Sequence, residues 1–149
     1  MPLVPPPCGL SEDQRLIIET VGEFARTELF PLDRKWDEDE SSSADILPKL
    51  AEMGILNLGL PEDANGLECP YRVYAAIIHE LATWSPSVAV TVAVHSMVGN
   101  NLHKFVSGRL RTDLLAHWGD PANFAAFCLS EAGAGSDAGA TKTTSRSDP

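Results

Sequence analysis

Cysteine, aromatic residues and long apolar runs are all scarce in this 149-residue chain. Its three cysteines, Cys8, Cys69 and Cys128, are far apart and form no CxxC pair, which argues against a disulfide framework and a zinc site. We therefore expect a reducing, cytoplasmic environment. No apolar run reaches the length of a membrane span, and residues 1–10 have no basic residue ahead of their apolar positions. We expect neither a membrane span nor a secretory leader.

Positive charge is also in short supply. The chain has 11 Lys and Arg against 21 Asp and Glu, and its formal net charge is -10. The acidic excess lies in residues 1–68, which hold 15 acidic and 5 basic side chains, whereas residues 69–149 hold 6 of each. Binding to nucleic acid needs a basic surface, so we expect no nucleic-acid partner. The acidic side chains are most simply explained as solvated helix faces.

Metal-binding and hydrolase motifs are missing as well. The sequence contains neither an HExxH pattern nor a GxSxG elbow. We therefore predict no metal site, and we expect satisfied or exposed side chains at all four histidines, His79, His95, His103 and His117. Cys128 lies in an apolar stretch and is predicted to be a small buried side chain. The three tryptophans are predicted to be core or interface anchors, at Trp36, Trp84 and Trp118.

Helical signals fill the chain up to about residue 120. Ser11 and Gln14 form a capping box, and apolar positions follow at helical spacing until Pro31 interrupts them. Residues 33–40 either prolong this helix or restart it. A short helix is predicted over residues 46–53, ending at Gly54.

The second half of the helical region begins after a loop predicted at residues 61–70. Helices are expected at residues 73–81, 87–101 and 112–118. The β-branched run at residues 88–94 could also be a strand, but no turn signal bounds it, so a helix is favoured. Residues 125–129 are the first credible strand.

The most informative stretch is residues 127–137, FCLSEAGAGSD, in which an apolar segment runs into a turn rich in glycine and serine. Gly133 and Gly135 allow positive φ and close approach to the backbone, while Ser130 and Ser136 add hydroxyl donors. Such a turn can hold a phosphate, although it matches neither the dinucleotide GxGxxG spacing nor a P-loop. A plain surface turn is the alternative.

Several segments, taken in order, resemble the acyl-CoA dehydrogenase family of flavoenzymes. The likeness extends over roughly residues 10–147, in the segments 10–14, 56–62, 80–82, 87–90, 94–96, 129–137 and 142–144. It implies a mainly α protein with a flexible N-terminus at residues 1–9 and a helical, up-and-down-like domain at residues 10–121. Residues 122–149 would be the incomplete start of a β-barrel-like middle domain, comprising its first strand and an FAD-contacting turn.

The resemblance also implies flavin chemistry, in which an acyl-CoA thioester is oxidised at Cα–Cβ to a 2-enoyl-CoA. The FAD contacts would be Phe127, Leu129, Ser130, Gly135 and Ser136. Ser136 would also border the acyl-CoA substrate. The family's base carboxylate belongs to a C-terminal domain, so no catalytic residue is assigned in this chain. The chain would be a truncated or split part of an enzyme of fatty-acid or branched-chain acyl catabolism, inactive alone.

The sequence departs from the family pattern in two places. Phe127 stands where some members have tyrosine, and Ala132 stands where proline is frequent, but both keep the segment extended and apolar. The loop at residues 61–68 retains only Gly66 of a glycine-rich cluster, although Asn65 can itself adopt a left-handed conformation.

Two alternatives stay open at this point. The chain could be a non-catalytic helical interaction module derived from the same family, or part of an acyl-CoA oxidase or flavin monooxygenase relative. The partners implied by the resemblance are an acyl-CoA substrate and an electron-transfer flavoprotein or another acceptor. A complementing chain or a homo-oligomer is a further possibility.

Overall fold

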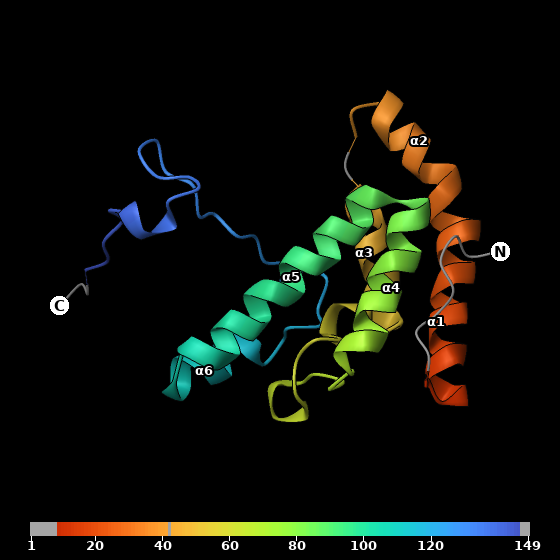
Figure 1. Ribbon diagram of the computed structural model, residues 1–149, viewed down its shortest axis with the longest axis horizontal. Coiled ribbons are helices and arrows are strands. Elements are labelled where there is room, and N and C mark those ends of the chain that lie inside the picture. Colours follow the sequence, from red (N-terminus) through yellow and green to blue (C-terminus); the bar gives the residue numbers. More distant parts are fainter. Residues whose placement is uncertain (1–8, 42, 147–149) are drawn as a thin grey trace.

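The protein is a bundle of helices followed by an extended C-terminal segment (Figure 1). The computed structural model describes residues 9–41 and 43–146, so most of the expected flexible N-terminus lies outside the described residues. The three longest helices pack in the order α1 (Glu12–Phe24), α4 (Tyr71–Trp84) and α5 (Pro86–Phe105), with α4 in the middle. The predicted helical fold is confirmed. No helix in the described ranges is both long and apolar enough to cross a membrane.

The first helix begins where the capping box predicts. The Ser11 hydroxyl accepts a hydrogen bond from the Gln14 amide at 3.2 Å, and the Gln14 side chain accepts one from the Ser11 amide at 3.1 Å. These two bonds satisfy main-chain donors that the first turn of a helix leaves open. The buried face of α1 then enters the core through Ile18, Val21 and Phe24.

The helix does not stop at Pro31. A π-helical turn at Ala25–Leu29 leads directly into α2 (Phe30–Glu38), so the first helix is prolonged through residues 33–38, and residues 39–40 form a turn (Figure 1). Proline lacks the N–H that an α-helix interior needs, but here it lies in the first turn of α2, after the wider turn has changed the register.

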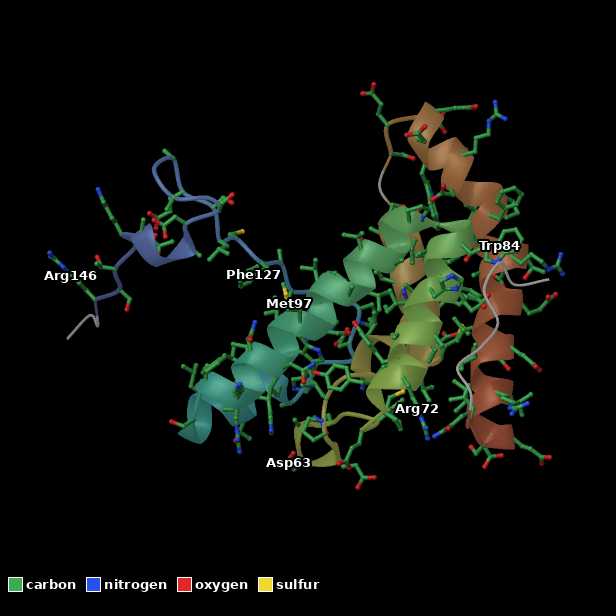
Figure 2. The ribbon with its side chains drawn as sticks, viewed as in Figure 1. Asp63, Arg72, Trp84, Met97, Phe127 and Arg146 are labelled. Carbon is green, nitrogen blue, oxygen red and sulfur yellow. The ribbon has the colours of Figure 1, made fainter. Side chains whose placement is uncertain are left out.

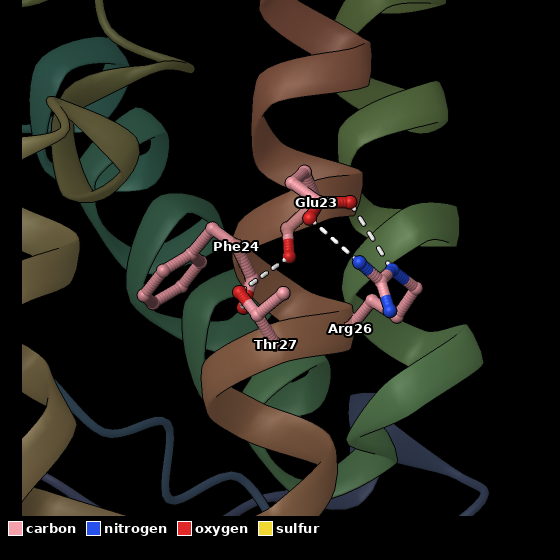
Figure 3. Close-up of polar contacts among 4 residues, drawn as sticks. All are labelled: Glu23, Phe24, Arg26 and Thr27. Carbon is pink, nitrogen blue, oxygen red and sulfur yellow. Dashed lines mark hydrogen bonds and ion pairs between the residues drawn. The ribbon is translucent and has the colours of Figure 1, made fainter.

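Side chains support the α1 end of this π-helical turn (Figure 3). The Arg26 guanidinium binds both carboxylate oxygens of Glu23, at 2.6 and 3.1 Å, and the Thr27 hydroxyl donates to the Glu23 carbonyl oxygen at 2.8 Å. Both contacts are exposed to solvent, so they contribute little to the free energy of unfolding and act mainly on the local backbone conformation.

The segment between α2 and α4 is a series of short turns around α3 (Leu47–Glu52). Gly54 follows α3 with a φ of 71°, as its predicted role at the helix end requires. In the next loop Asn65 adopts the left-handed conformation, with a φ of 59°. Gly66 has no room for a side chain, because a Cβ there would lie 1.8 Å from the Leu60 carbonyl oxygen. The close approach of the Leu60 backbone therefore requires glycine at position 66.

Helices α4 and α5 meet at a tight corner built on Ser85. This buried residue caps α5 by accepting from the Val88 amide at 3.4 Å, and its hydroxyl donates to Asp33 Oδ1 of α2 at 2.5 Å. The β-branched run at residues 88–94 is helical, as favoured from the sequence. The last α-helix, α6 (Gly108–Leu115), begins four residues earlier than predicted and ends three residues earlier, and only two residues separate it from α5. A short 3-10 helix follows in the C-terminal segment at Ala138–Ala140.

Two groups of buried side chains form the core. The larger one joins α1, α3, α4 and α5, and Trp36 and Trp84 pack against it. The smaller one, which contains Trp118, lies between α6 and the loop at residues 60–64. The tryptophans are thus core anchors, as predicted.

The C-terminal segment contains the predicted turn but not the predicted strand. Residues 125–129 form no strand, and the one β-bridge in the described residues joins Glu131 to Ala134. A strand requires a neighbouring strand for its main-chain hydrogen bonds, and no strand lies beside residues 125–129 in the described part of the chain. Cys128 is consequently exposed, which corrects the prediction that it is buried.

Candidate functional site

Residues 131–143 form a loop that is closed by one carboxylate. Glu131 and Ala134 exchange two main-chain hydrogen bonds, at 2.8 and 3.2 Å, which makes a tight turn. The Glu131 carboxylate then accepts from the amides of Lys142 and Thr143, at 2.9 and 2.8 Å, and from the Thr143 hydroxyl. The two ends of the loop are held together in this way, as in a compact Ω-loop.

Glu131 closes the loop as an ionised carboxylate. The Thr143 hydroxyl and the amides of Lys142 and Thr143 all donate to the carboxylate, and they lower its pKa from the ordinary value. Glu131 lies within the predicted motif, but the sequence alone did not assign it a role. The sequence contained one indication of this role, because Glu131 and Thr143 lie in two segments that resemble the family, 129–137 and 142–144. That these two segments are in contact could be seen only in the tertiary structure.

All five predicted FAD contacts lie on the segment that contains this loop, and all of them are exposed. Phe127 and Leu129 expose 47% and 44% of their surface, although both are large and apolar. The polar contacts lie farther along the segment, at Ser130, Gly135 and Ser136. Figure 2 shows Phe127 on the stretch that leaves the helices, and Arg146 near the far end of the segment.

The loop carries hydrogen-bond donors that have no partner. Within the described part of the chain, neither the Gly135 and Ser136 amides nor the Ser130 and Ser136 hydroxyls make a hydrogen bond. Gly133 and Gly135 do not use the positive φ that glycine allows. A Cβ on either glycine would meet nothing within 4 Å, so the space beside both is open. Exposed amides and hydroxyls of this kind can bind an anionic oxygen.

A separate hollow of about 330 Å³ lies between α4, α5 and the loop before α4. Its wall combines the Tyr74 ring, Ala93 and Met97 with the Ser96 hydroxyl, which is buried and makes no hydrogen bond. Burial raises the pKa of Tyr74. The hollow could take a small amphipathic group, but none of the predicted FAD contacts lines it.

The expectation of satisfied or exposed histidines is confirmed for His95 but is wrong for His103, whose Nδ1 is buried and makes no hydrogen bond. His95 is fully buried and both of its ring nitrogens bind main-chain groups. In the described ranges, no group of three or more His, Cys, Asp or Glu side chains is placed to hold a metal ion.

Comparison with known families decides the family of the chain. The family profile described as "Acyl-CoA dehydrogenase, N-terminal domain" matches residues 11–118. The chain belongs to the acyl-CoA dehydrogenase family. The family resemblance found in the sequence is thereby confirmed, and the matched range covers every helix from α1 to α6.

Several relatives in the acyl-CoA dehydrogenase family are similar over nearly the whole chain. The short-chain specific acyl-CoA dehydrogenase of Bos taurus is 30% identical over 93% of this chain and 34% of its own length. The isobutyryl-CoA dehydrogenase of Dictyostelium discoideum is 29% identical over 96% of this chain and 34% of its own. The chain thus spans about a third of the length of these relatives.

Solved structures share the fold. A chain from a study of the electron transferring flavoprotein of Acidaminococcus fermentans superposes with a TM-score of 0.83 and 25% identity. It matches 93% of this chain and 37% of its own length. Butyryl-CoA dehydrogenase from Megasphaera elsdenii superposes with a TM-score of 0.81 and 21% identity, over 92% of this chain and 37% of its own.

Proposed function

We propose that this chain is the N-terminal part of an FAD-dependent acyl-CoA dehydrogenase that oxidises acyl-CoA thioesters to 2-enoyl-CoA products. Family membership supports the proposal, as do relatives named for short-chain acyl-CoA and isobutyryl-CoA. In this proposal residues 10–121 are the helical domain and residues 122–149 begin a middle β-domain. The chain is inactive alone, because it spans about a third of its relatives and no base carboxylate is assigned in it.

The observation that carries the proposal is the closed loop at residues 131–143, with its open glycines and unpaired donors. FAD has an apolar ring system and an anionic pyrophosphate. The exposed side chains of Phe127 and Leu129 fit the ring, and the amides of Gly135 and Ser136 fit the pyrophosphate. The residues present therefore suit the cofactor.

In the proposed reaction, bound FAD supplies the acceptor for the hydride that leaves Cβ of the substrate. The residues of this chain would bind and orient the cofactor and the substrate. Ser130 would donate its hydroxyl or amide towards the flavin ring, and Ser136 would border both the cofactor and the acyl-CoA. Removal of the proton from Cα is assigned to a carboxylate outside this chain.

Electrons would then pass to an electron-transfer flavoprotein or another acceptor. The similarity to a chain from the Acidaminococcus fermentans electron transferring flavoprotein study supports this part of the proposal. A complementing chain or a second copy is also proposed as a partner. The exposed apolar side chains of Val90 and Phe105 on α5 support it, because exposed apolar side chains can mark a surface that a partner covers.

We propose a reducing, cytoplasmic location. The two cysteines in the described ranges, Cys69 and Cys128, are unpaired, which is typical of reducing compartments. The bovine relative is named as mitochondrial.

The direct experiment is to incubate the purified chain with FAD, remove free cofactor by desalting and record the visible absorbance. Flavin bands that stay with the protein would support the proposal. A colourless protein would favour the alternative, a helical interaction module that keeps the family's fold without its cofactor.

A further inference from the structure

His95 connects the helical domain to the segment that carries the flavin loop. It lies in α5 with no exposed surface, and its ring is stacked between those of Trp118 and Phe124. The ring centroids are 4.3 and 4.5 Å away and the interplanar angles are 12° and 17°. Both stacking partners belong to the stretch of chain that follows α6. The His95 side chain of α5 is therefore packed between two aromatic rings of that stretch.

Hydrogen bonds fix the protonation state of this ring. Nδ1 of His95 accepts from the Ala125 amide at 3.2 Å, and Nε2 lies 3.3 Å from the Trp118 carbonyl oxygen. An amide N–H can only donate and a carbonyl oxygen can only accept, so Nδ1 has no proton and Nε2 has one. The ring is thus a neutral imidazole in a single tautomer, and it joins Trp118 to Ala125.

On the same face of α5, a glycine leaves the space that the Trp118 indole occupies. Gly99 lies one helical turn after His95, and a Cβ on it would stand 2.7 Å from the Trp118 indole. Trp118 is 4% exposed, so this contact belongs to the core. The stretch at residues 118–125 is consequently held at its start by Gly99 and His95, and at its end by His95.

We propose that His95 is a positioning residue for the flavin segment: its imidazole clamps residues 118–125 and thereby sets the direction in which residues 127–136 leave the helical domain. Only one residue separates Ala125 from Phe127, the first proposed flavin contact. Figure 2 shows Phe127 at the point where the segment departs. The link to flavin rests on the proposed function, whereas the clamp rests on the contacts of His95 alone.

Two substitutions separate the parts of this clamp. His95→Phe keeps a flat ring for stacking but removes both hydrogen bonds. His95→Gln removes the stacked ring but has an oxygen that can accept from Ala125 and an amide that can donate to Trp118. His117→Phe is the matched control, because His117 is exposed.

Two readouts report on the clamp without requiring cofactor. The first is hydrogen exchange of the Ala125 amide, measured by NMR together with the ¹⁵N shifts of the His95 ring. The second is the pattern of paramagnetic relaxation that a nitroxide on Cys128 produces at the amides of α5. Cys128 is exposed, and replacing Cys8 and Cys69 by serine makes its labelling unique.

In the parent chain we expect an Nε2–H tautomer and a protected Ala125 amide. His95→Phe should speed exchange at Ala125 at least about tenfold while amides in the middle of α4 change less than about twofold. The relaxation pattern on α5 should weaken and spread in His95→Phe, remain close to the parent in His95→Gln, and be unchanged in His117→Phe.

The proposal is overturned by an Nδ1–H tautomer in the parent chain, a test that requires no variant to fold. It is also overturned if His95→Phe leaves both Ala125 exchange and the relaxation pattern unchanged. Failure of the parent chain to bind FAD would count against the proposed function only. FAD binding that is equally strong in the parent and in His95→Phe would remove the positioning role even if the clamp itself opened.

Discussion

Gly99 lies against the indole of Trp118 so closely that a Cβ on the glycine would stand 2.7 Å from Cε2 and 2.8 Å from Nε1. The indole is buried and forms part of the smaller core cluster, so it has little room to move. We expect Gly99→Ala to lower the free energy of unfolding by about 1–2 kcal/mol, because overpacking at this site outweighs the helix propensity that alanine adds within α5. Thermal unfolding followed by circular dichroism measures the loss.

Gly22→Ala is the matched control for that prediction. A Cβ on Gly22 of α1 would lie 2.9 Å from Glu80 Oε2, which is the end of a flexible side chain that can move aside. Alanine also favours helix over glycine by about 1 kcal/mol. Gly22→Ala should therefore be close to neutral, and an equal loss in both variants would contradict the packing explanation.

Stability should depend on pH through His95. Burial lowers the pKa of His95, and the bond to the Trp118 carbonyl opposes this only in part. The unfolded chain binds a proton at this residue below about pH 6.5, whereas the folded ring resists it, so the free energy of unfolding should fall as pH decreases through that range. Urea unfolding between about pH 5 and about pH 8 measures the slope.

His95→Gln removes the titrating group and should flatten the slope, whereas His117→Gln, at an exposed site, should not. An unchanged slope in His95→Gln would assign the pH dependence to other groups.

Asn65 should stabilise the domain through its side chain and its backbone separately. Its Nδ2 donates to the Leu115 and Ala116 carbonyl oxygens, at 3.2 and 2.8 Å, and so caps the end of α6. Its φ is 59°, which favours glycine or asparagine. We expect Asn65→Ala to cost about 2–3 kcal/mol and Asn65→Gly about 1–2 kcal/mol, because glycine keeps the backbone but loses the cap.

Equilibrium urea unfolding tests this order. If Asn65→Gly is as stable as the parent chain, the two hydrogen bonds do not contribute.

Glu131→Gln should open the loop at residues 131–143 without affecting the helical domain. Glutamine has one carbonyl oxygen where the carboxylate has two acceptors, and it lacks the charge that strengthens the bonds to Lys142 and Thr143. The amide signals of these two residues should move upfield and exchange faster. In the parent chain the same change should occur as pH falls through the lowered pKa of Glu131.

NMR exchange rates of the Thr143 amide measure the opening, and the α1 amides serve as the internal reference. A Thr143 amide that exchanges at the same rate in Glu131→Gln would show that the carboxylate does not close the loop.

Local sequence signals predicted the helical half of the fold well. The capping box at Ser11 and the glycine at the end of α3 depend on nearby residues, so a single sequence contains them. The helix at residues 88–94 was favoured partly by the family resemblance, because the local pattern also allowed a strand. Pro31 was judged by its usual effect inside an α-helix. The π-helical turn that accommodates it could not be read from composition.

The remaining differences arise from contacts between distant residues. The strand expected at residues 125–129 has suitable side chains but no partner strand among residues 9–41 and 43–146. The roles of His95 and Glu131 depend on Ala125 and Thr143, which lie 30 and 12 residues away. No local pattern marks such pairs. The loop residues proposed to bind FAD could be named only because the family resemblance pointed to them.

Titration of FAD into the parent chain, Gly135→Ala and Gly133→Ala tests most directly whether the loop is a flavin site. A Cβ on either glycine meets nothing within 4 Å, so neither variant should disturb the fold. Only Gly135 is proposed to lie against the pyrophosphate, where a methyl group would block the approach. Flavin fluorescence should show saturable binding to the parent chain, nearly unchanged in Gly133→Ala and at least about tenfold weaker in Gly135→Ala. No saturable binding to the parent chain, or equal losses in the two variants, would contradict the proposed site.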